Sequence, residues 1–142
     1  MSRRDRYCAI GDPQRDIMRC RRREETASVL VARLSRDGRL APGDLVACFR
    51  LTDSVAAGRR GGSIELVAVF DDHRLERDGL ERRLLAAARG ARVELEWLRF
   101  PEDGVTLEAL VARGRAALSA RNGRRRAPRV GAVPLSTAGG ER

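Results

Sequence analysis

The clearest pattern of apolar and polar positions lies in the middle of the chain, at 61–72, where two glycines precede a mostly apolar run and Asp71-Asp72 ends it. Side chains alternate across a strand, and Glu65 is the only charged residue before Asp71. Both faces are therefore largely apolar, which predicts an interior strand that is covered on at least part of each side. One face carries Ile64, Leu66, Ala68 and Phe70.

The segment 58–62, just before this strand, consists of three glycines and two arginines. Glycine tolerates the positive φ angles of tight turns, so a loop between antiparallel strands is predicted from Asp53 to Gly62, with this segment as its centre. A partner strand is predicted at 45–52, where one face is apolar throughout. A third strand is predicted at 92–99, with Val93, Leu95 and Trp97 facing inward.

Three helices are predicted from capping signals and apolar spacing. The first starts at Pro13 after a capping Asp12 and runs to about Asp37, where Gly38 can end it. Its core-facing stripe is predicted to be Ala27, Leu30, Val31 and Leu34. The second ends at Gly90 and presents Leu80, Leu84, Leu85, Ala87 and Ala88. The third follows a capping Thr106 and presents Leu107, Leu110, Val111, Gly114 and Leu118.

The order helix, strand, strand, helix, strand, helix predicts an α+β domain with a three-stranded sheet and helices packed mainly on one face. This single domain is expected to span 12–121, between a basic N-terminal arm at 1–11 and a disordered basic tail at 122–142. The residues expected to be buried together are Leu30, Leu34, Leu66, Ala68, Phe70, Leu84, Val93 and Leu95.

Charge is concentrated at the two ends of the chain. The formal charge is +9, and all 29 basic residues counted in it are arginine. Residues 1–23 hold eight Arg and three Asp, a net +5, residues 113–142 hold eight Arg and one Glu, a net +7, and the segment between them is −3. The arginine codons of a GC-rich genome explain the absence of lysine better than a need for guanidinium contacts to phosphate does. The charged ends are typical of a polyanion binder, and solubilising tails without a specific partner explain them equally well.

Several classes of protein are disfavoured. The three cysteines form no Cys-x-x-Cys or Cys/His cluster, so neither a zinc site nor a disulfide framework is predicted. No apolar run reaches the length of a membrane span, and the N-terminus lacks the apolar stretch of a secretory signal, so a cytoplasmic protein without membrane association is expected. No cofactor is predicted.

Asp71, Asp72 and His73 directly follow the central strand, a position where α/β active sites often gather carboxylates. A metal or acid–base role would need partners from elsewhere in the fold. The simpler interpretation is that Asp72 or a neighbour caps the next helix and that His73 is exposed. We therefore predict no catalytic residue and no metal ligand.

Two family resemblances bear on function. Residues 17–112 resemble ribosome-binding factor A, a KH-like RNA-binding protein of ribosome maturation. The predicted helix, two strands, helix and third strand parallel the order in that family, and Ala88-Arg89-Gly90 matches its Ala-x-Gly kink. The segment after this kink departs from the family, because Arg92-Val93 begins a strand at once where a second helical half is expected.

The segment 45–98 also resembles a minimal nucleotidyltransferase core. Asp53-Ser54 stands at the turn of that family, Ser63-Ile64-Glu65 at its carboxylate pair and Glu94 at its third carboxylate. Serine replaces the first acid of the pair, and two-metal phosphoryl transfer needs carboxylates that clamp both ions. This resemblance therefore implies an inactive relative.

Charge placement and the KH-like order favour a non-enzymatic RNA-binding protein, with ribosomal RNA as the expected partner and ribosome assembly as the process. An inactive nucleotidyltransferase-fold module, or a scaffold that acts through a protein partner, stays open as the alternative. The predicted nucleic-acid contacts are Arg19, Arg21, Arg22, Arg23, Arg59, Arg60, Arg124, Arg125 and Arg126.

Overall fold

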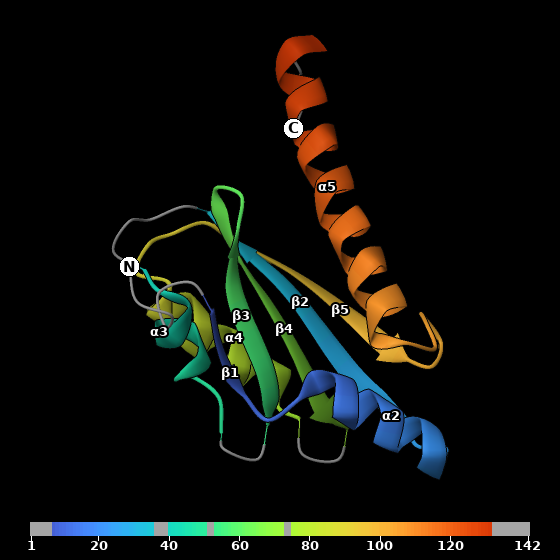
Figure 1. Cartoon of the computed structure of the whole chain (residues 1–142). Helices are drawn as coiled ribbons and strands as arrows, with labels where there is room; N and C mark the ends of the chain where they lie inside the picture. Colours follow the sequence, from blue (N-terminus) through green and yellow to red (C-terminus); the bar gives the residue numbers. More distant parts are fainter. Residues whose placement is uncertain (1–6, 36–39, 51–52, 73–74, 132–142) are drawn as a thin grey trace.

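The computed structural model describes residues 7–35, 40–50, 53–72 and 75–131, the last ten of these as helical backbone only. Five antiparallel strands form one sheet in the order β1-β3-β4-β2-β5, with helices against it (Figure 1). The strands are β1 (Tyr7–Ile10), β2 (Ala27–Leu34), β3 (Ser54–Arg60), β4 (Ser63–Asp71) and β5 (Val93–Phe100). The helices are α2 (Pro13–Arg23), α3 (Pro42–Val46), α4 (Arg77–Ala87) and α5 (Leu107–Gly131). The α+β class is confirmed, whereas the prediction of three strands was wrong.

The segment 27–34 accounts for much of this difference, because it is strand β2 and not the second half of a helix. α2 ends at Arg23, and Glu24 leaves it in a left-handed conformation with φ 55°. β2 then pairs along its whole length with β4 on one edge and β5 on the other. Residues four apart share a face in a strand as well as in a helix, so the spacing of Leu30 and Leu34 fitted both structures.

The region before β4 also differs from the prediction. Segment 45–52 was predicted as a strand, but α3 covers its start and its last two residues lie outside the described part of the chain. The strand that pairs with β4 is β3, which lies mostly where a loop was predicted. The predicted turn is confirmed in a shorter form, because the strands end at Arg60 and begin again at Ser63, and Gly61 has φ +60°.

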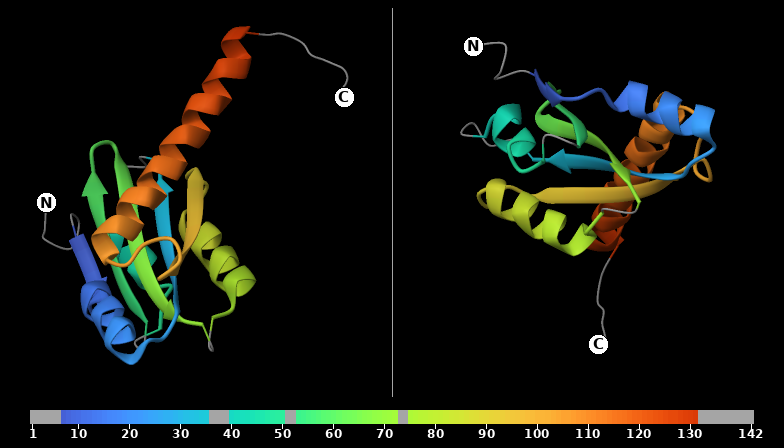
Figure 2. Two further views of the ribbon diagram at one scale, coloured as in Figure 1. Left: turned by 90° about the vertical axis from the view of Figure 1, so that its right-hand side faces the viewer. Right: turned by 90° about the horizontal axis from the view of Figure 1, so that it is seen from below.

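Helices cover both faces of the sheet, so the prediction of helices mainly on one face was wrong (Figure 2). α3 and α4 pack over the face that carries Leu30, Leu66 and Phe70. Six of the eight residues expected to be buried together lie in that core, and the other two, Val93 and Leu95, are half-buried at its margin. α2 and α5 cover the other face, where Gly114 of α5 lies so close to β2 that an added Cβ would stand 2.8 Å from the Cβ of Val31.

The local signals at the helix ends are confirmed. The Asp12 carboxylate accepts hydrogen bonds from the backbone N–H groups of Gln14 and Arg15, and Thr106 Oγ1 accepts one from Ala109 N at 3.0 Å. Gly90, with φ +87°, follows the end of α4. α5 continues to Gly131, past the predicted domain end at 121, and the predicted arm and tail lie mostly outside the described residues. No helix in the described part of the chain is long and apolar enough to cross a membrane.

Candidate functional site

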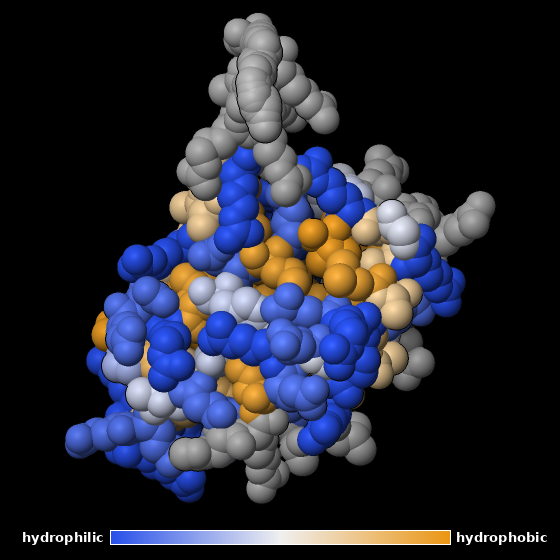
Figure 3. Space-filling view, turned by 180° about the vertical axis from the view of Figure 1, so that it is seen from behind, coloured by the Kyte–Doolittle hydropathy of each residue, from blue (hydrophilic) through white to orange (hydrophobic). Residues whose placement is uncertain are grey.

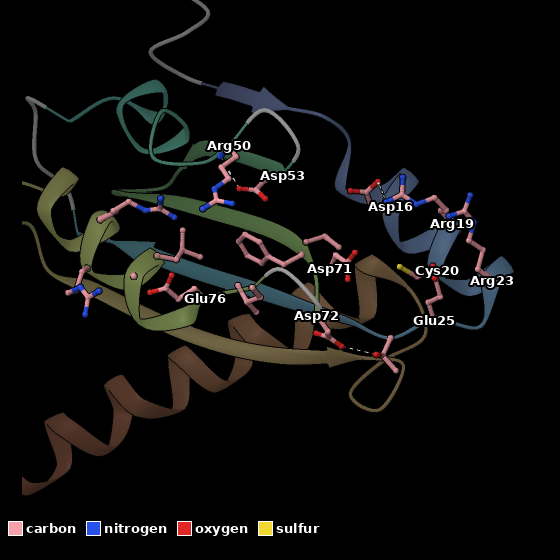
Figure 4. Close-up of a pocket in the computed structure, with 18 residues that line it drawn as sticks. Asp16, Arg19, Cys20, Arg23, Glu25, Arg50, Asp53, Asp71, Asp72 and Glu76 are labelled. Carbon is pink, nitrogen blue, oxygen red and sulfur yellow. Dashed lines mark hydrogen bonds and ion pairs between the residues drawn. The ribbon is translucent and has the colours of Figure 1, made fainter.

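A pocket of about 790 Å³ lies where the end of β4 meets α2 and α4 (Figure 4). Its floor is apolar and comes from the two cores, with Val69, Phe70 and Leu80 buried beneath it. Its rim is charged and carries five arginines and six carboxylates from separate segments of the chain. The fold therefore places an apolar base and a ring of ionised groups at one end of the sheet.

Most of the arginines at this rim have no side-chain partner in the part of the chain that the structure describes. Arg19 of α2 forms an ion pair of 3.0 Å with Asp16 on the same helix. Within the described residues, no hydrogen bond or ion pair engages the side chains of the other four, which are exposed. These are Arg23, Arg50, Arg82 and Arg83.

Asp72 is the carboxylate most firmly held in the fold. It accepts hydrogen bonds from Thr26 Oγ1 and Ser28 Oγ, each at 2.7 Å, and Arg99 Nη2 lies 3.2 Å from its Oδ2. Burial raises the pKa of Asp72, but the bonds from Ser28 and Thr26 and the charge of Arg99 outweigh burial and hold the pKa below its ordinary value. Asp72 therefore ties the end of β4 to β2 and β5, and the N-cap residue of α4 is Glu76.

Two other carboxylates also support the local backbone. Asp53 Oδ2 accepts a hydrogen bond of 2.9 Å from Arg50 N, which closes the short segment between them. The Glu76 carboxylate lies across Gly79, where an added Cβ would meet its Oε1 at 2.8 Å. A carboxylate in this position interacts favourably with the N-terminal dipole of α4.

Cys20 lies at the α2 side of the pocket, among acidic side chains. Burial raises the pKa of its thiol, Arg19 lowers it, and Glu25, Asp16 and Asp71 raise it further. Burial likewise raises the pKa of Cys48, against the opposing charge of Arg83. All three cysteines are free thiols, and no described group of His, Cys, Asp and Glu side chains could hold a metal ion.

The opposite end of the sheet carries a second charged cluster, which we call the paired end: Arg33, Glu65, Glu94, Glu96, Arg115 and Arg121. Arg33 is directly opposite both Glu65 and Glu94 on the neighbouring strands. Arg115 binds Glu65 with two hydrogen bonds of 2.7 and 2.6 Å. Arg33 pairs with Glu94, and Arg121 pairs with Glu96 and donates to Leu95 O. Every charge in this cluster has a partner.

The arginines predicted as nucleic-acid contacts are dispersed. Arg19 and Arg23 reach the pocket, and Arg21 and Arg22 are exposed in the last turn of α2. Arg59 donates to Leu40 O at 2.8 Å, and Arg60 lies 3.9 Å from Glu65. Residues 124–126 belong to the part of α5 whose side chains are not described. A nucleic-acid contact by any of these residues stays an untested prediction.

Sequence reasoning missed Arg50, Arg82 and Arg83 as site residues. Arg50 was counted within a predicted strand, and the two others lie on the polar face of the helix that became α4. The one available signal was the run of acidic residues at 71–72, directly after the central strand and just before that helix. Exposed apolar residues give no alternative site, because Tyr7, Met18, Leu85 and Val105 are spread over different segments.

The surface supports the same conclusion. Figure 3 shows one face of the molecule, on which apolar residues form patches bordered by hydrophilic side chains. The large exposed apolar side chains belong to different segments and do not define a docking site. The pocket, where charged side chains from separate segments surround an apolar base, is the candidate site that the described residues support best.

Comparisons with known proteins give similarity only to solved structures. No family model matches the chain, and no curated protein matches it. A sensory box/GGDEF family protein from Caulobacter crescentus CB15 is 18% identical, with 78% of this chain and 87% of that chain covered and a TM-score of 0.47. A DGC protein from Thermotoga maritima is 14% identical, with 70% and 86% covered and a TM-score of 0.45. Neither similarity assigns a function to this chain.

These findings correct both family resemblances. The similar structures are described as GGDEF and DGC proteins, so the predictions of ribosome-binding factor A and of a nucleotidyltransferase core were wrong. The fold agrees with this correction, because the leading helix that the first resemblance needed is replaced in part by β2. Glu65 and Glu94, which the second resemblance needed as metal ligands, are held by arginines.

The functions predicted from these two family resemblances are corrected as well. The scaffold alternative rested on the basic ends of the chain. RNA binding in ribosome assembly rested on the first resemblance together with the charge of these ends, and the inactive nucleotidyltransferase-fold module rested on the second. All three were wrong, because the similar structures are GGDEF and DGC proteins.

Proposed function

We propose that the protein is a non-enzymatic binding module that holds a small ligand with a phosphate group in the pocket beside α4. The observation that carries the proposal is the group of exposed arginines at this rim, Arg50, Arg82 and Arg83, none of which has a side-chain partner among the described residues. They come from two segments that are distant in the sequence and line one cavity.

The chemistry of guanidinium supports an anionic ligand. Its planar fork of donors matches the oxygens of a phosphate, and bonds between ionised partners are stronger than neutral ones. Arginines gathered around one cavity repel one another unless an anion is bound between them. A bound phosphate would reduce this repulsion, so the pocket gains more from an anion than an isolated surface arginine would.

The carboxylates around the pocket support binding without chemistry. Asp72 is held by three side chains, and Asp53 is held by the backbone of Arg50. A general base must be within reach of the proton that it abstracts, and both groups are already engaged in supporting the fold. His73 lies outside the described residues, so no role is proposed for it.

The proposal is tested by titrating the full chain with inorganic phosphate at constant ionic strength, with chloride as the competing anion. Binding should raise the melting temperature in proportion to the logarithm of phosphate concentration well above Kd. Replacing Arg83 by Gln removes a charge-assisted contact and should weaken phosphate binding about tenfold. Calorimetric titration gives the affinity directly.

The matched control is Arg22→Gln, which removes an exposed arginine from α2 outside the pocket. It should leave phosphate affinity unchanged. Equal losses in the two variants would mean that phosphate responds only to net charge, and the proposal would then be wrong.

A further inference from the structure

The charges around the pocket are divided between its two ends. The end formed by α4 and its neighbours has Arg50, Arg82 and Arg83 against Asp53 and Glu76, three arginines and two acids, a net +1. The end formed by α2 and the last residue of β4 has Asp16, Glu25 and Asp71 against Arg19 and Arg23, three acids and two arginines, a net −1. Asp72 lies between them and is neutralised by Arg99. Figure 4 shows the labelled side chains of the two groups on opposite sides of Asp72.

Glu25 is the acid at the α2 end that remains available. It is exposed, and within the described residues no hydrogen bond or ion pair engages its side chain, whereas Asp16 is paired with Arg19. The raised pKa of Cys20 supports the same arrangement, because after burial its causes include the charges of Glu25, Asp16 and Asp71 around one thiol. Negative charge is therefore concentrated at this end.

A purely anionic ligand would fit only half of this pocket. Its phosphate would bind the three arginines, but any part that reached the α2 end would meet the carboxylate of Glu25, which has no side-chain partner among the described residues. This is unfavourable in a partly desolvated cavity. A ligand with a positive group at its far end would instead satisfy both. The apolar floor, with Phe70 and Leu80 beneath the cavity, suits a hydrocarbon segment between the two charges.

We infer that the ligand is zwitterionic, a phosphate monoester that carries an ammonium group, with the phosphate at Arg50, Arg82 and Arg83 and the ammonium at Glu25. This inference rests on the proposed function and adds the polarity of the ligand and its direction in the pocket. It also assigns Glu25 as the residue that distinguishes such ligands from simple phosphates.

The test compares two probes that differ in one group, pentyl phosphate and 5-aminopentyl phosphate, by calorimetric titration of the full chain. The amine should strengthen binding about fivefold, the upper range for an exposed ion pair. Glu25→Gln should remove this preference and leave the affinity for pentyl phosphate unchanged. Arg83→Gln should weaken both probes by the same factor, because it acts on the phosphate that they share.

Glu24→Gln is the matched control, since Glu24 is the adjacent exposed acid and does not line the pocket. It should preserve the preference for the amine. The comparison is repeated with shorter and longer alkyl chains. If the native chain binds the probes with and without the amine equally well at every length, the zwitterionic ligand is ruled out, whereas the phosphate site is not. Failure of both probes and of inorganic phosphate to bind would overturn the proposed function and this inference together.

Discussion

The two ends of the sheet both carry arginines and carboxylates but use them differently. At the paired end, each carboxylate of β4 and β5 has an arginine within 4.0 Å, and two of these arginines come from α5. At the pocket end, Asp72 and Asp16 are engaged, while Arg23, Arg50, Arg82 and Arg83 have no side-chain partner among the described residues. One end is internally neutralised, and the other is open to a ligand.

This difference shows why charge composition is a poor guide to function. Paired charges that hold a helix on a sheet contribute to stability and leave little field for a partner. Arginines that line a cavity without partners contribute little to stability and remain able to bind. Substitutions at the two ends should therefore affect different measurements, stability at the paired end and ligand affinity at the pocket end.

The largest effect should come from the apolar core that lies between these clusters. Phe70 is buried, stacks on Phe49 with ring centroids 5.9 Å apart, and forms part of the pocket floor. Phe70→Ala should lower the free energy of unfolding by about 3–5 kcal/mol, since it leaves a cavity in the core. Urea unfolding measures this loss. The control Leu85→Ala, at a residue that is 53% exposed, should change the free energy of unfolding very little. Equal losses in the two variants would mean that β4 is not central to the core.

The paired end should give the next largest effect. The side chain of Glu65 is only 17% exposed, so Glu65→Gln leaves Arg115 without its ionised partner in a half-buried site. We expect a loss of about 1–2 kcal/mol in the free energy of unfolding, between the values for exposed and buried pairs. Glu102→Gln, at a pair whose carboxylate is 71% exposed, is the control and should change stability very little. Equal free energies of unfolding for Glu65→Gln and Glu102→Gln would mean that the paired end contributes no stability.

Asp72 should give a smaller effect that depends on pH. Its pKa is lowered in the folded protein, so the ionised form stabilises the fold above its ordinary pKa of 3.8. This contribution should disappear as pH falls from about 3.8 through the lower folded value. The difference in unfolding free energy between the native chain and Asp72→Asn, measured from pH 6 down to pH 2, should therefore shrink in acid. A difference independent of pH would contradict the lowered pKa.

The smallest effect on stability should come from the pocket arginines. Arg82→Gln and Arg83→Gln remove exposed side chains without partners among the described residues, so each should change the free energy of unfolding by less than about 0.5 kcal/mol. Chemical denaturation checks this, with Glu65→Gln measured in parallel. A loss as large as that of Glu65→Gln would show that these arginines support the fold, and the contrast between the two ends would then be wrong.

Local signals in the sequence predicted part of the fold correctly. The caps at Asp12 and Thr106, the turn at Gly61, the central strand and the strand predicted at 92–99 all depend on residues close to one another in the chain. The structure has the last of these strands at Val93–Phe100. The prediction of a helix at 27–34 was wrong because the apolar spacing of this segment suits a helix and a strand equally. Val29 and Val31, both β-branched and fully buried, favour the strand once β4 and β5 lie on both sides.

The sequence by itself determined how charge is distributed along the chain and, through local conformational preferences, where α2 and α5 begin and where the central strand lies. Only the tertiary structure decided which charges are neutralised. Arg115 and Glu65 are 50 residues apart and meet because α5 packs against β2 and β5, beside β4. Arg50 and Arg83 instead approach one cavity and find no carboxylate partner within the described residues. Coulomb energy depends on distance in space and on burial, and neither can be read from the order of residues.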